Sequence, residues 1–550
     1  MHATHEVTNQ ARPLVGANLF EINSPLRDAL AVHAPDLDLS RLRALGAEAG
    51  SPAMQAHARL ANTHAPVLHT HDRLGHRIDE VEFHPSYHAL MASALRHGLH
   101  GSPWTGPAGA HIERAAAFML YTEAEPSVLC PVSMTYAVTP ALRANPALQA
   151  AWGGKLASRD YDARFIPFER KTAVTMGMGM TEKQGGSDVR ANTTRAEPDG
   201  DDAWGARVRI TGHKWFMSAP MCDAFLVLAQ AAGGLSCYFL PRWLPDGTRN
   251  AIAIQRLKHK LGNHANASSE VEFHGATAWR VGDEGRGVPQ ILTMGAMTRL
   301  DCALGTAGLM RQALTLAIHH TAQRAAFGKA LVAQPLMKNV LADLALESEA
   351  ATALAMRLAV AVDRSEQTAN DHEAVMRRLL TPVAKFWICK RGSHFGQEAM
   401  ECLGGNGYVE EGGEGVMARI YREMPLNSIW EGAGNIMALD LLRALRGADV
   451  APALEHEFAP ARGRHAAFDR AADGVLLCVA AGTEEGQARG LARDVALVLQ
   501  ASLLHRQSPQ AVFDAFCDTR LAQASDVFGT LPARHDADAL VHRAYPLETH

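Results

Sequence analysis

The chain has 550 residues, of which 47% are hydrophobic and 20% are charged, and its formal net charge at pH 7 is −5. This composition is typical of a globular protein and excludes a disordered chain. The negative balance argues against a globally basic nucleic-acid binder and leaves only a local basic groove open.

The first residues, Met1-His-Ala-Thr-His-Glu-Val7, lack the basic and apolar regions of a signal peptide. No uninterrupted apolar run approaches the roughly 20 residues that a membrane helix needs. We therefore expect a cytoplasmic protein that does not enter a membrane.

The length exceeds a single hydrophobic core and predicts several domains, and the apolar pattern divides the chain into four ranges. Residues 1–175 show helical spacing and predict a helical N-terminal domain. Residues 176–285 change to short β-prone runs between Gly, Pro, Asn and Asp, which predict a small β-barrel or sandwich. Residues 286–446 return to long helical periods and predict a helical bundle. Residues 447–550 predict a further helical segment.

The eight cysteines include no Cys-x-x-Cys pair, so we expect reduced, buried thiols and neither a disulfide nor a zinc site. Four of them lie in apolar helical patterns: Cys302, Cys389, Cys402 and Cys478. The histidines that most suggest a metal are His64, His69, His71 and His76. Because no acidic or cysteine partner stands at ligand spacing, we predict a solvated loop and no metal.

Two separated segments carry the strongest chemical signal, Met180-Thr-Glu-Lys-Gln-Gly-Gly-Ser-Asp188 and Asn427-Ser-Ile-Trp-Glu-Gly-Ala-Gly-Asn435. The first is a Gly-rich polar loop whose backbone N–H groups can approach a ring or phosphate without hindrance from Cβ atoms. The second holds one carboxylate between a tryptophan and a glycine. A carboxylate held in a fixed position can act as a general base.

Two more segments follow in order, Arg324-Ala-Ala-Phe-Gly-Lys329 and Gly404-Gly-Asn-Gly-Tyr408. Together the four segments resemble the flavin-contacting motifs of acyl-CoA dehydrogenases. Within that family, the phrases Gly177–Asp188, Gly212-His-Lys-Trp-Phe216 and Arg422–Glu431 are similar to the AidB branch, the flavoproteins of the adaptive response to DNA alkylation. The similarity runs over most of the chain and is weakest at its two ends.

The resemblance implies a mainly α-helical protein with a central β-domain. This is the acyl-CoA dehydrogenase fold of an α-helical N-terminal domain, a β-barrel and a four-helix bundle, here with a C-terminal helical extension. It implies FAD as the cofactor and an acyl-CoA or a related small molecule as the substrate. The residues implied to contact FAD from the β-domain are Met180, Thr181, Gly186, Ser187, Phe216, Met217 and Ser218. Those implied from the helical bundle are Arg324, Phe327, Gly404, Gly405, Trp430, Gly432 and Asn435.

Glu431 is the residue on which the implied activity depends. Taken alone, Ser428-Ile-Trp-Glu431 also fits a capping box, in which the glutamate only receives a backbone N–H at a helix start. The resemblance implies instead that Glu431 is the catalytic base, with Trp430 in place of a tyrosine. On that role Glu431 takes a proton from the carbon next to the thioester while a hydride passes to FAD. Some relatives carry the base immediately before an arginine that resembles Arg299, but that position is Thr298 here, which cannot act as a base.

Arg324 ends a long helical pattern, where a guanidinium can fork onto a pyrophosphate or simply stabilise the helix C-terminus. In the resemblance, Arg324 and the Gly404–Gly407 segment reach the cofactor of a neighbouring subunit. This implies at least a dimer and predicts a homotetramer, a dimer of dimers. Glu401 stands where glutamine is frequent, and a carboxylate near a diphosphate is unfavourable unless it turns away.

The resemblance also implies a surface for double-stranded DNA, without sequence preference, on the C-terminal extension. Residues 447–550 hold nine arginines, no lysine and fourteen acidic residues. Because duplex affinity depends on cations that face phosphates, this balance is unfavourable. Two functions linked to DNA alkylation stay open: an FAD-dependent enzyme that uses Glu431, and a non-catalytic flavoprotein that protects duplex DNA.

Overall fold

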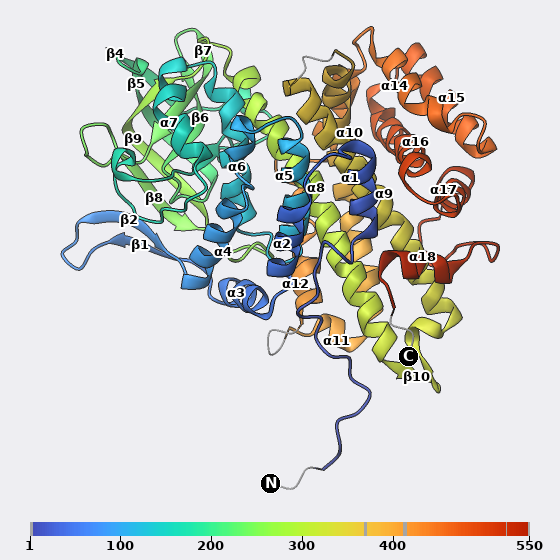
Figure 1. The fold of residues 1–550 in the computed structure, drawn as a ribbon. Coiled ribbons are helices and arrows are strands. Elements are labelled where there is room, and N and C mark those ends of the chain that lie inside the picture. Colours follow the sequence, from blue (N-terminus) through green and yellow to red (C-terminus); the bar gives the residue numbers. More distant parts are fainter. Residues whose placement is uncertain (1–3, 368–370, 411–414, 524, 548–550) are drawn as a thin grey trace. The chain divides into compact units, whose positions relative to one another are not determined.

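The computed structural model describes residues 4–367, 371–410, 415–523 and 525–547. Its contacts divide the chain into two compact units. The first unit comprises Met1–Pro52, His111–Glu123 and Cys302–His550, and the second comprises Ala53–Ala110 and Ala124–Asp301. Most of the ribbon is helical, with the strands concentrated in the middle of the sequence (Figure 1). The division into four ranges by sequence pattern stays a prediction.

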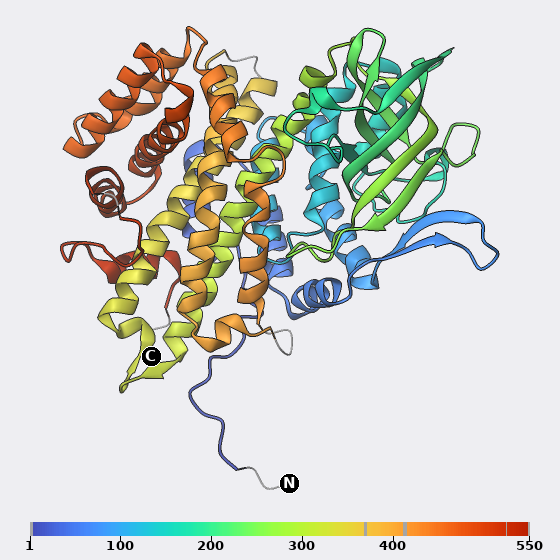
Figure 2. The same cartoon turned by 180° about the vertical axis from the view of Figure 1, so that it is seen from behind.

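A closed β-barrel forms the centre of the second unit. Its strands are β3 (Met176–Gly179), β4 (Arg195–Asp202), β5 (Gly205–Ser218), β6 (Ala224–Ala231), β7 (Gly234–Pro241), β8 (Ile252–Leu257) and β9 (Ser268–Arg280). Strand β6 pairs with both β4 and β7, and β5 and β9 complete the path between those two strands, so the pairing returns to β6. Strand β3 joins β6 in parallel, and β8 joins β9 (green in Figure 2). The predicted β-domain is confirmed.

The second unit also contains helices. They are α3 (Pro52–Thr63), α4 (Pro85–Arg96), α6 (Leu129–Leu142), α7 (Pro146–Ala157) and the start of α8 (Gly287–Gln323). Asn145 caps α7 by accepting a hydrogen bond from the backbone N–H of Leu148, and its Nδ2 donates to the carbonyls of Trp204 and Arg280. Trp152 of α7 stacks on Phe168 with ring centroids 4.4 Å apart. An N-cap and an aromatic cluster thus fasten α7 to the strands.

The histidine-rich segment of the second unit is an exposed β-hairpin, so the predicted exposure of the four histidines to solvent is confirmed, but the predicted loop was wrong for His69 and His71. Strands β1 (Val67–His71) and β2 (Arg77–Glu82) pair antiparallel, with Nε2 of His69 lying 2.9 Å from Oε2 of Glu82. Cross-strand side-chain pairs of this kind stabilise a hairpin. The number of histidines in the segment gives no indication of such pairs. Among the described residues, no group of three or more His, Cys, Asp or Glu side chains is placed to hold a metal ion.

The first unit is helical. Its longer helices are α1 (Ser24–His33), α2 (Ser40–Ala49), α5 (Ala110–Thr122), the end of α8, α9 (Pro335–Gln367), α10 (Asp371–Glu401), α12 (Val416–Glu423), α13 (Gly434–Ala444), α14 (Val450–Phe458), α15 (Ala466–Ala481), α16 (Ala488–Gln507), α17 (Gln510–Phe516) and α18 (Ala537–Ala544). A two-residue turn joins the short strands β10 (Ala325–Ala326) and β11 (Lys329–Ala330), and α11 spans Gly405–Tyr408. Helices α9 and α10 pack side by side, with α16 and α18 against α9 and α13 against α10 (Figure 2).

All eight cysteines are free thiols, and seven of them are buried. Cys478 is exposed, which corrects the prediction that it is buried. The buried side of α15 ends at Val475, so the last turns of the helix carry Cys478 and the 69% exposed Leu477 outward. Of the helices in the described ranges, none is long and apolar enough to cross a membrane.

A buried ionic network joins three helices of the first unit. Arg357 of α9 donates to Glu373 of α10 at 2.8 Å and forks onto Glu457 of α14 at 2.6 and 3.1 Å. All three side chains are at most 6% exposed. Burial opposes ionisation of Glu457, but the hydrogen bonds and the charge of Arg357 outweigh it and lower the pKa of Glu457 to about 2.

Replacing Glu457 by glutamine should lower the free energy of unfolding by about 3 kcal/mol at pH 7, because Arg357 loses a buried counter-charge. The folded-state pKa lies below the usual 4.5, so this stabilisation is complete above pH 4.5 and disappears as the pH falls toward 2. Urea unfolding followed by circular dichroism should show the gap between wild type and variant closing over that range.

Glu455→Gln is the matched control, because Glu455 is 49% exposed and pairs with Arg462. Its effect should stay below about 0.5 kcal/mol. Equal effects of the two variants, or a gap for Glu457→Gln that does not depend on pH, would contradict this assignment.

Candidate functional site

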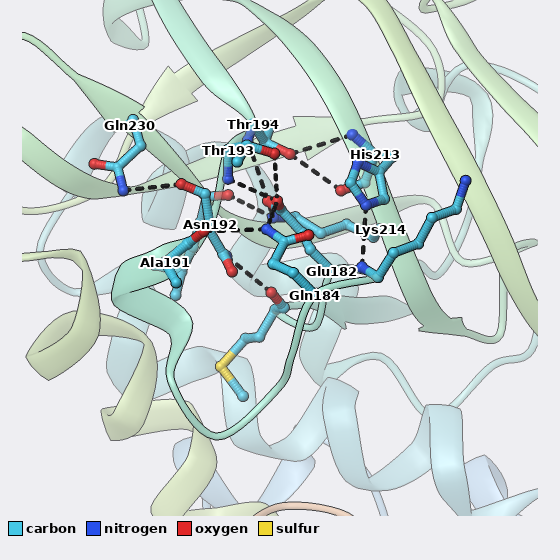
Figure 3. Close-up of polar contacts among 12 residues, drawn as sticks. Glu182, Gln184, Ala191, Asn192, Thr193, Thr194, His213, Lys214 and Gln230 are labelled. Carbon is cyan, nitrogen blue, oxygen red and sulfur yellow. Dashed lines mark hydrogen bonds and ion pairs between the residues drawn. The ribbon is translucent and has the colours of Figure 1, made fainter.

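The Gly-rich loop Met180–Asp188 of the second unit is built around a buried carboxylate. Oε1 of Glu182 accepts a hydrogen bond from Nζ of Lys214 at 2.8 Å, and neither side chain is exposed. Oε2 of Glu182 accepts from the backbone N–H of Thr193 at 2.7 Å and from Nε2 of Gln184 at 2.8 Å (Figure 3). The same carboxylate therefore ties the loop to strand β5 and to the segment that precedes β4.

Glu182 and Lys214 are a charged pair at neutral pH. Burial lowers the pKa of Lys214 to about 8, although the charge of Glu182 raises it. Burial alone would raise the pKa of Glu182, but Lys214 and the hydrogen bonds from Thr193 and Thr194 lower it to about 2. Nζ of Lys214 also donates to the carbonyl of Leu228 on β6, so the buried ammonium has two hydrogen-bond acceptors from the protein.

The loop residues expected to contact the cofactor lie beside this pair. The carbonyl of Met180 accepts from Nδ2 of Asn192, and the carbonyl of Thr181 accepts from the backbone N–H of Trp215. A Cβ atom on Gly186 would come within 2.7 Å of Oγ1 of Thr181, so the loop needs glycine there. Ser187 is exposed. Hydrogen bonds to the backbone carbonyls therefore fix the conformation of the loop, and the polar side chain of Ser187 faces solvent.

The end of strand β5 carries the other three expected contacts of this unit. Phe216 is 49% exposed, whereas the side chain of Met217 is buried. Oγ of Ser218 lies 3.3 Å from Oγ of Ser268. The register of β5 and β9 shifts between Lys214 and Met217, and this irregularity places Phe216 next to the ammonium of Lys258, which lies 4.6 Å from its ring centroid.

Glu431, in the first unit, adopts a left-handed backbone conformation. Its φ is +59°, and Gly432 follows with a φ of +109°. Nζ of the buried Lys385 donates to the carbonyl of Gly432, which fixes the peptide that joins Gly432 to Ala433. Positive φ is costly for a residue with a Cβ atom and clusters at functional sites.

The preceding tryptophan is fixed as well. Nε1 of Trp430 donates to Oδ1 of Asn427 at 2.9 Å, and Nδ2 of Asn427 donates to Oγ1 of Thr306 on α8 at 3.1 Å. Asn435, the last residue of this group, is exposed and accepts from Nη1 of Arg489 at 3.0 Å. The backbone around the candidate base is therefore held from α8, α10 and α16.

The structure does not support the capping-box interpretation of Ser428 and Glu431. Helix α13 begins at Gly434, its N-cap residue is Ala433, and no side chain caps it. Ser428 instead lies in a 3-10 turn, where its hydroxyl donates to the carbonyl of Pro425. Glu431 therefore lies before the helix start instead of inside its first turn.

Arg324, Phe327, Gly404 and Gly405 belong to the first unit. Phe327 and Gly328 form the two-residue turn between β10 and β11 with φ values of +52° and +77°, and the Phe327 side chain is 98% exposed. Arg324 precedes the turn, and its Nη1 donates to the carbonyl of Asn9 at 2.7 Å. Gly404 has a φ of +61°, and Cβ atoms on either glycine would meet open space.

Sequence reasoning missed the residues that support these groups. They are Asn9, Glu182, Lys258, Lys385 and Asn427. Glu182 and Asn427 stand inside the quoted motifs, and Lys385 is a lysine within an apolar helical run, so a search for polar residues in apolar patterns could have found them. Asn9 has no such signal.

Three family models match the chain. Residues 9–163 match the adaptive response protein AidB N-terminal domain, residues 177–276 the acyl-CoA dehydrogenase middle domain, and residues 285–446 the acyl-CoA dehydrogenase C-terminal domain. The AidB protein of Escherichia coli is 49% identical over 85% of both chains. Acyl-CoA dehydrogenase family member 11 of Caenorhabditis elegans is 32% identical over 71% of this chain and 64% of its own length.

Solved structures agree with the sequence matches. The apo form of Bd2924 is 30% identical, covers 91% of this chain and all of its own, and has a TM-score of 0.83. Caenorhabditis elegans ACDH-11, solved in complex with C11-CoA, is 26% identical, covers 96% of this chain and 95% of its own, and also has a TM-score of 0.83.

This chain therefore belongs to the acyl-CoA dehydrogenase family, a family of FAD-dependent oxidoreductases, and within it to the AidB branch.

Glu182→Gln should loosen the Met180–Asp188 loop, because it removes the counter-charge of a fully buried lysine. Lys183 is exposed within the loop and offers a trypsin site. Cleavage after Lys183, followed by mass spectrometry, should speed up by roughly tenfold or more as the loop opens more often. Glu197→Gln, an exposed carboxylate on β4, is the control and should leave the rate unchanged. Equal cleavage of wild type and Glu182→Gln would show that the loop does not depend on the pair.

Proposed function

We propose that the protein is an FAD-dependent acyl-CoA dehydrogenase-type enzyme in which Glu431 is the catalytic base. The observation that carries this proposal is the left-handed Glu431–Gly432 pair, held by Lys385 and by the Trp430–Asn427 hydrogen bond ahead of helix α13. A structure that only needed a turn here would favour glycine at both positions. A glutamate kept in this conformation fits a carboxylate that must point in a defined direction.

The residues present fit FAD. Gly186 lets the polar loop close on Thr181, and Phe216 offers a half-exposed aromatic face next to the Lys258 ammonium. Arg324 offers the planar donor fork that suits a pyrophosphate. We propose that the loop residues Met180, Thr181, Gly186 and Ser187, with Phe216, Met217 and Ser218, hold the flavin ring. For the first unit taken by itself, we propose Trp430, Gly432 and Asn435, beside Glu431, as flavin contacts, and Gly404, Gly405, Arg324 and Phe327 as contacts to the adenosine end.

The chain supplies the proton chemistry. Glu431, ionised, accepts a proton from the carbon next to the thioester carbonyl of the substrate. The fixed Gly432 peptide and the anchored Trp430 limit the directions in which the carboxylate can point, which favours a productive approach. FAD, when bound, supplies the acceptor for the two electrons that leave with the second hydrogen.

An acyl-CoA is the proposed substrate class. ACDH-11 shares this fold over almost its whole length and was solved with C11-CoA. The position before Arg299 is Thr298, so the family's alternative base position is not available and Glu431 is the base that we assign.

We also propose a homotetramer, a dimer of dimers. Phe327 is 98% exposed at the tip of the β10–β11 turn, and Tyr408 of α11 is 78% exposed. Large apolar side chains exposed to this extent fit a surface that a second subunit covers. Arg324 precedes Phe327 by three residues and Gly404–Gly405 immediately precede Asn406–Tyr408 in the sequence, which fits a cofactor contact from a neighbouring subunit.

Glu431→Gln should lower the rate of anaerobic flavin reduction by acyl-CoA by roughly two to four powers of ten, because the amide keeps the shape but cannot accept a proton. The flavin absorbance spectrum and the sedimentation coefficient should stay unchanged. Ser428→Ala is the matched control in the same turn and should reduce the flavin at nearly the wild-type rate. A variant with normal reduction rates would remove Glu431 as the base.

Duplex DNA is a second candidate partner, because the N-terminal match is to a protein of the adaptive response. The charges of the extension weigh against it. Six of its nine arginines already form ion pairs with carboxylates in the described part of the extension: Arg462, Arg493, Arg506, Arg520, Arg534 and Arg543. Exposed Arg464 and Arg470 are the arginines best placed to face phosphates.

If the extension binds duplex, retention of a labelled duplex at about 50 mM salt should not depend on sequence. It should fall by about 0.9 log units per log unit of salt for each phosphate neutralised. Replacing Arg464 and Arg470 together by alanine should reduce the number of phosphates neutralised by about two while FAD content stays constant. No retention of duplex by the intact protein at that salt would end the DNA-associated alternative and leave the enzyme.

A further inference from the structure

The N-terminal segment Asn9–Arg12 lies against the end of helix α8, more than 300 residues away in sequence. Oδ1 of Asn9 accepts from the backbone N–H of Ala325 at 2.7 Å, and Nδ2 of Asn9 donates to the carbonyl of Ala325 at 2.8 Å. The side-chain amide of Asn9 thus pairs with both polar groups of one residue, as a neighbouring strand would. Its left-handed φ of +55° is a conformation that asparagine tolerates better than most residues.

The backbone of Asn9 holds the adjacent arginine. Its carbonyl accepts from Nη1 of Arg324 at 2.7 Å. Asn9 therefore binds the backbone of Ala325 with its side chain and the guanidinium of Arg324 with its main chain. The bond uses one guanidinium N–H and leaves the rest of the planar fork for a second acceptor.

Two further contacts anchor the segment. The backbone N–H of Arg12 donates to Oε1 of Gln323 at 3.0 Å, and the carbonyl of Arg12 lies 2.8 Å from Nε2 of His319. Nδ2 of Asn406, inside the Gly404–Gly407 motif, lies 3.3 Å from Oε1 of Gln10. The segment thus contacts both parts of the chain to which we assign the adenosine end of FAD.

We infer that residues Asn9–Arg12 form an arm that positions Arg324 for the pyrophosphate of FAD. This inference rests on the proposed function. A free arginine side chain samples many rotamers and loses that freedom when it binds a phosphate. The Asn9 carbonyl fixes the guanidinium before the cofactor arrives, and the Asn9 amide fixes the backbone that carries it. Asn9 is a positioning residue that acts through Arg324 and is assigned no contact with the cofactor.

A simpler interpretation is that the arm only covers the polar end of α8. On that interpretation Asn9 would contribute to stability independently of Arg324, and its loss would add to the loss of the arginine. If the arm positions Arg324, the effects of the two substitutions on FAD binding should not add, because Asn9 has no guanidinium to position once Arg324 is replaced. The two interpretations therefore differ in whether the effects of two substitutions add.

The test is a double-mutant cycle on FAD retention. Wild type, Asn9→Ala, Arg324→Ala and the double variant are purified as full-length holoproteins and diluted in series, and released FAD is measured by its fluorescence. Asn9→Ala should raise the apparent Kd for FAD on the order of tenfold, through two lost hydrogen bonds. Arg324→Ala should raise it by roughly ten- to a hundredfold. The double variant should stay within about twofold of Arg324→Ala.

Two further variants separate the arm from general stability. Asn9→Gly keeps the positive φ and the backbone carbonyl but loses the side-chain amide, so it should raise the Kd less than Asn9→Ala. Thr8→Ala, at an exposed neighbouring position, should bind FAD like wild type. Sedimentation velocity on the same samples shows whether subunit assembly changes.

The outcomes distinguish this inference from the proposed function. A folded wild-type protein that cannot take up FAD overturns both. If wild type holds FAD but Asn9→Ala has no effect, or its effect adds in full to that of Arg324→Ala, the arm does not position the arginine and the flavoenzyme proposal stands. Unchanged retention by Arg324→Ala overturns the inference and the assignment of Arg324 to FAD, while the proposal of a flavoenzyme with Glu431 as its base stands.

Discussion

A lysine ammonium is expensive to bury, and this constraint shapes the backbone around both groups of candidate site residues. Lys214 and Lys385 are each 1% exposed. In the second unit, Lys214 finds its acceptors in Glu182 and the Leu228 carbonyl, and in the first unit Lys385 finds one in the Gly432 carbonyl. An uncompensated buried charge costs several kcal/mol. A shift of the Met180–Asp188 loop or of the Glu431 turn would therefore expose a lysine ammonium or leave it without its acceptor. The two motifs that identify the family are therefore also the segments that buried charges fix.

The features of the fold that depend on local sequence patterns were predicted from the sequence. Alternating β-prone runs and long helical periods gave the β-domain and the bundle, and the motifs indicated the family that the comparisons confirm. Local patterns failed where a contact comes from far away. The hairpin of β1 and β2 depends on cross-strand pairs such as His69 with Glu82, and the exposure of Cys478 depends on where the packing of α15 ends. Asn9 contacts Ala325 across 316 positions, and no period or motif marks such a residue in advance.

The C-terminal extension shows why net charge is a poor guide to a binding surface. Its arginines are largely used to fasten helices together: Arg520 bonds Asp343 and Glu347 of α9, and Arg543 bonds Glu349 of the same helix. Buried and half-buried arginines in such pairs contribute to the fold and cannot release counterions from a phosphate backbone. The excess of acidic residues in the extension predicts weak affinity for duplex DNA. The structure adds a second reason, because most arginines of the extension are already paired with carboxylates.

Backbone strain gives an argument about Glu431 that does not depend on homology. Six residues other than glycine have a positive φ in the described ranges: Asn9, Asp79, Ala219, Asn263, Phe327 and Glu431. Asparagine and aspartate adopt this conformation with little penalty, but phenylalanine and glutamate do not. Glycine at position 327 or 431 would relieve the strain, as it does at the adjacent Gly328 and Gly432. A large side chain at a position where glycine would cause less backbone strain indicates that the side chain itself has a role. The aromatic ring at 327 is 98% exposed and is therefore suited to contact something outside its own fold, and the strained turn at 431 is consistent with the catalytic role that we propose for Glu431.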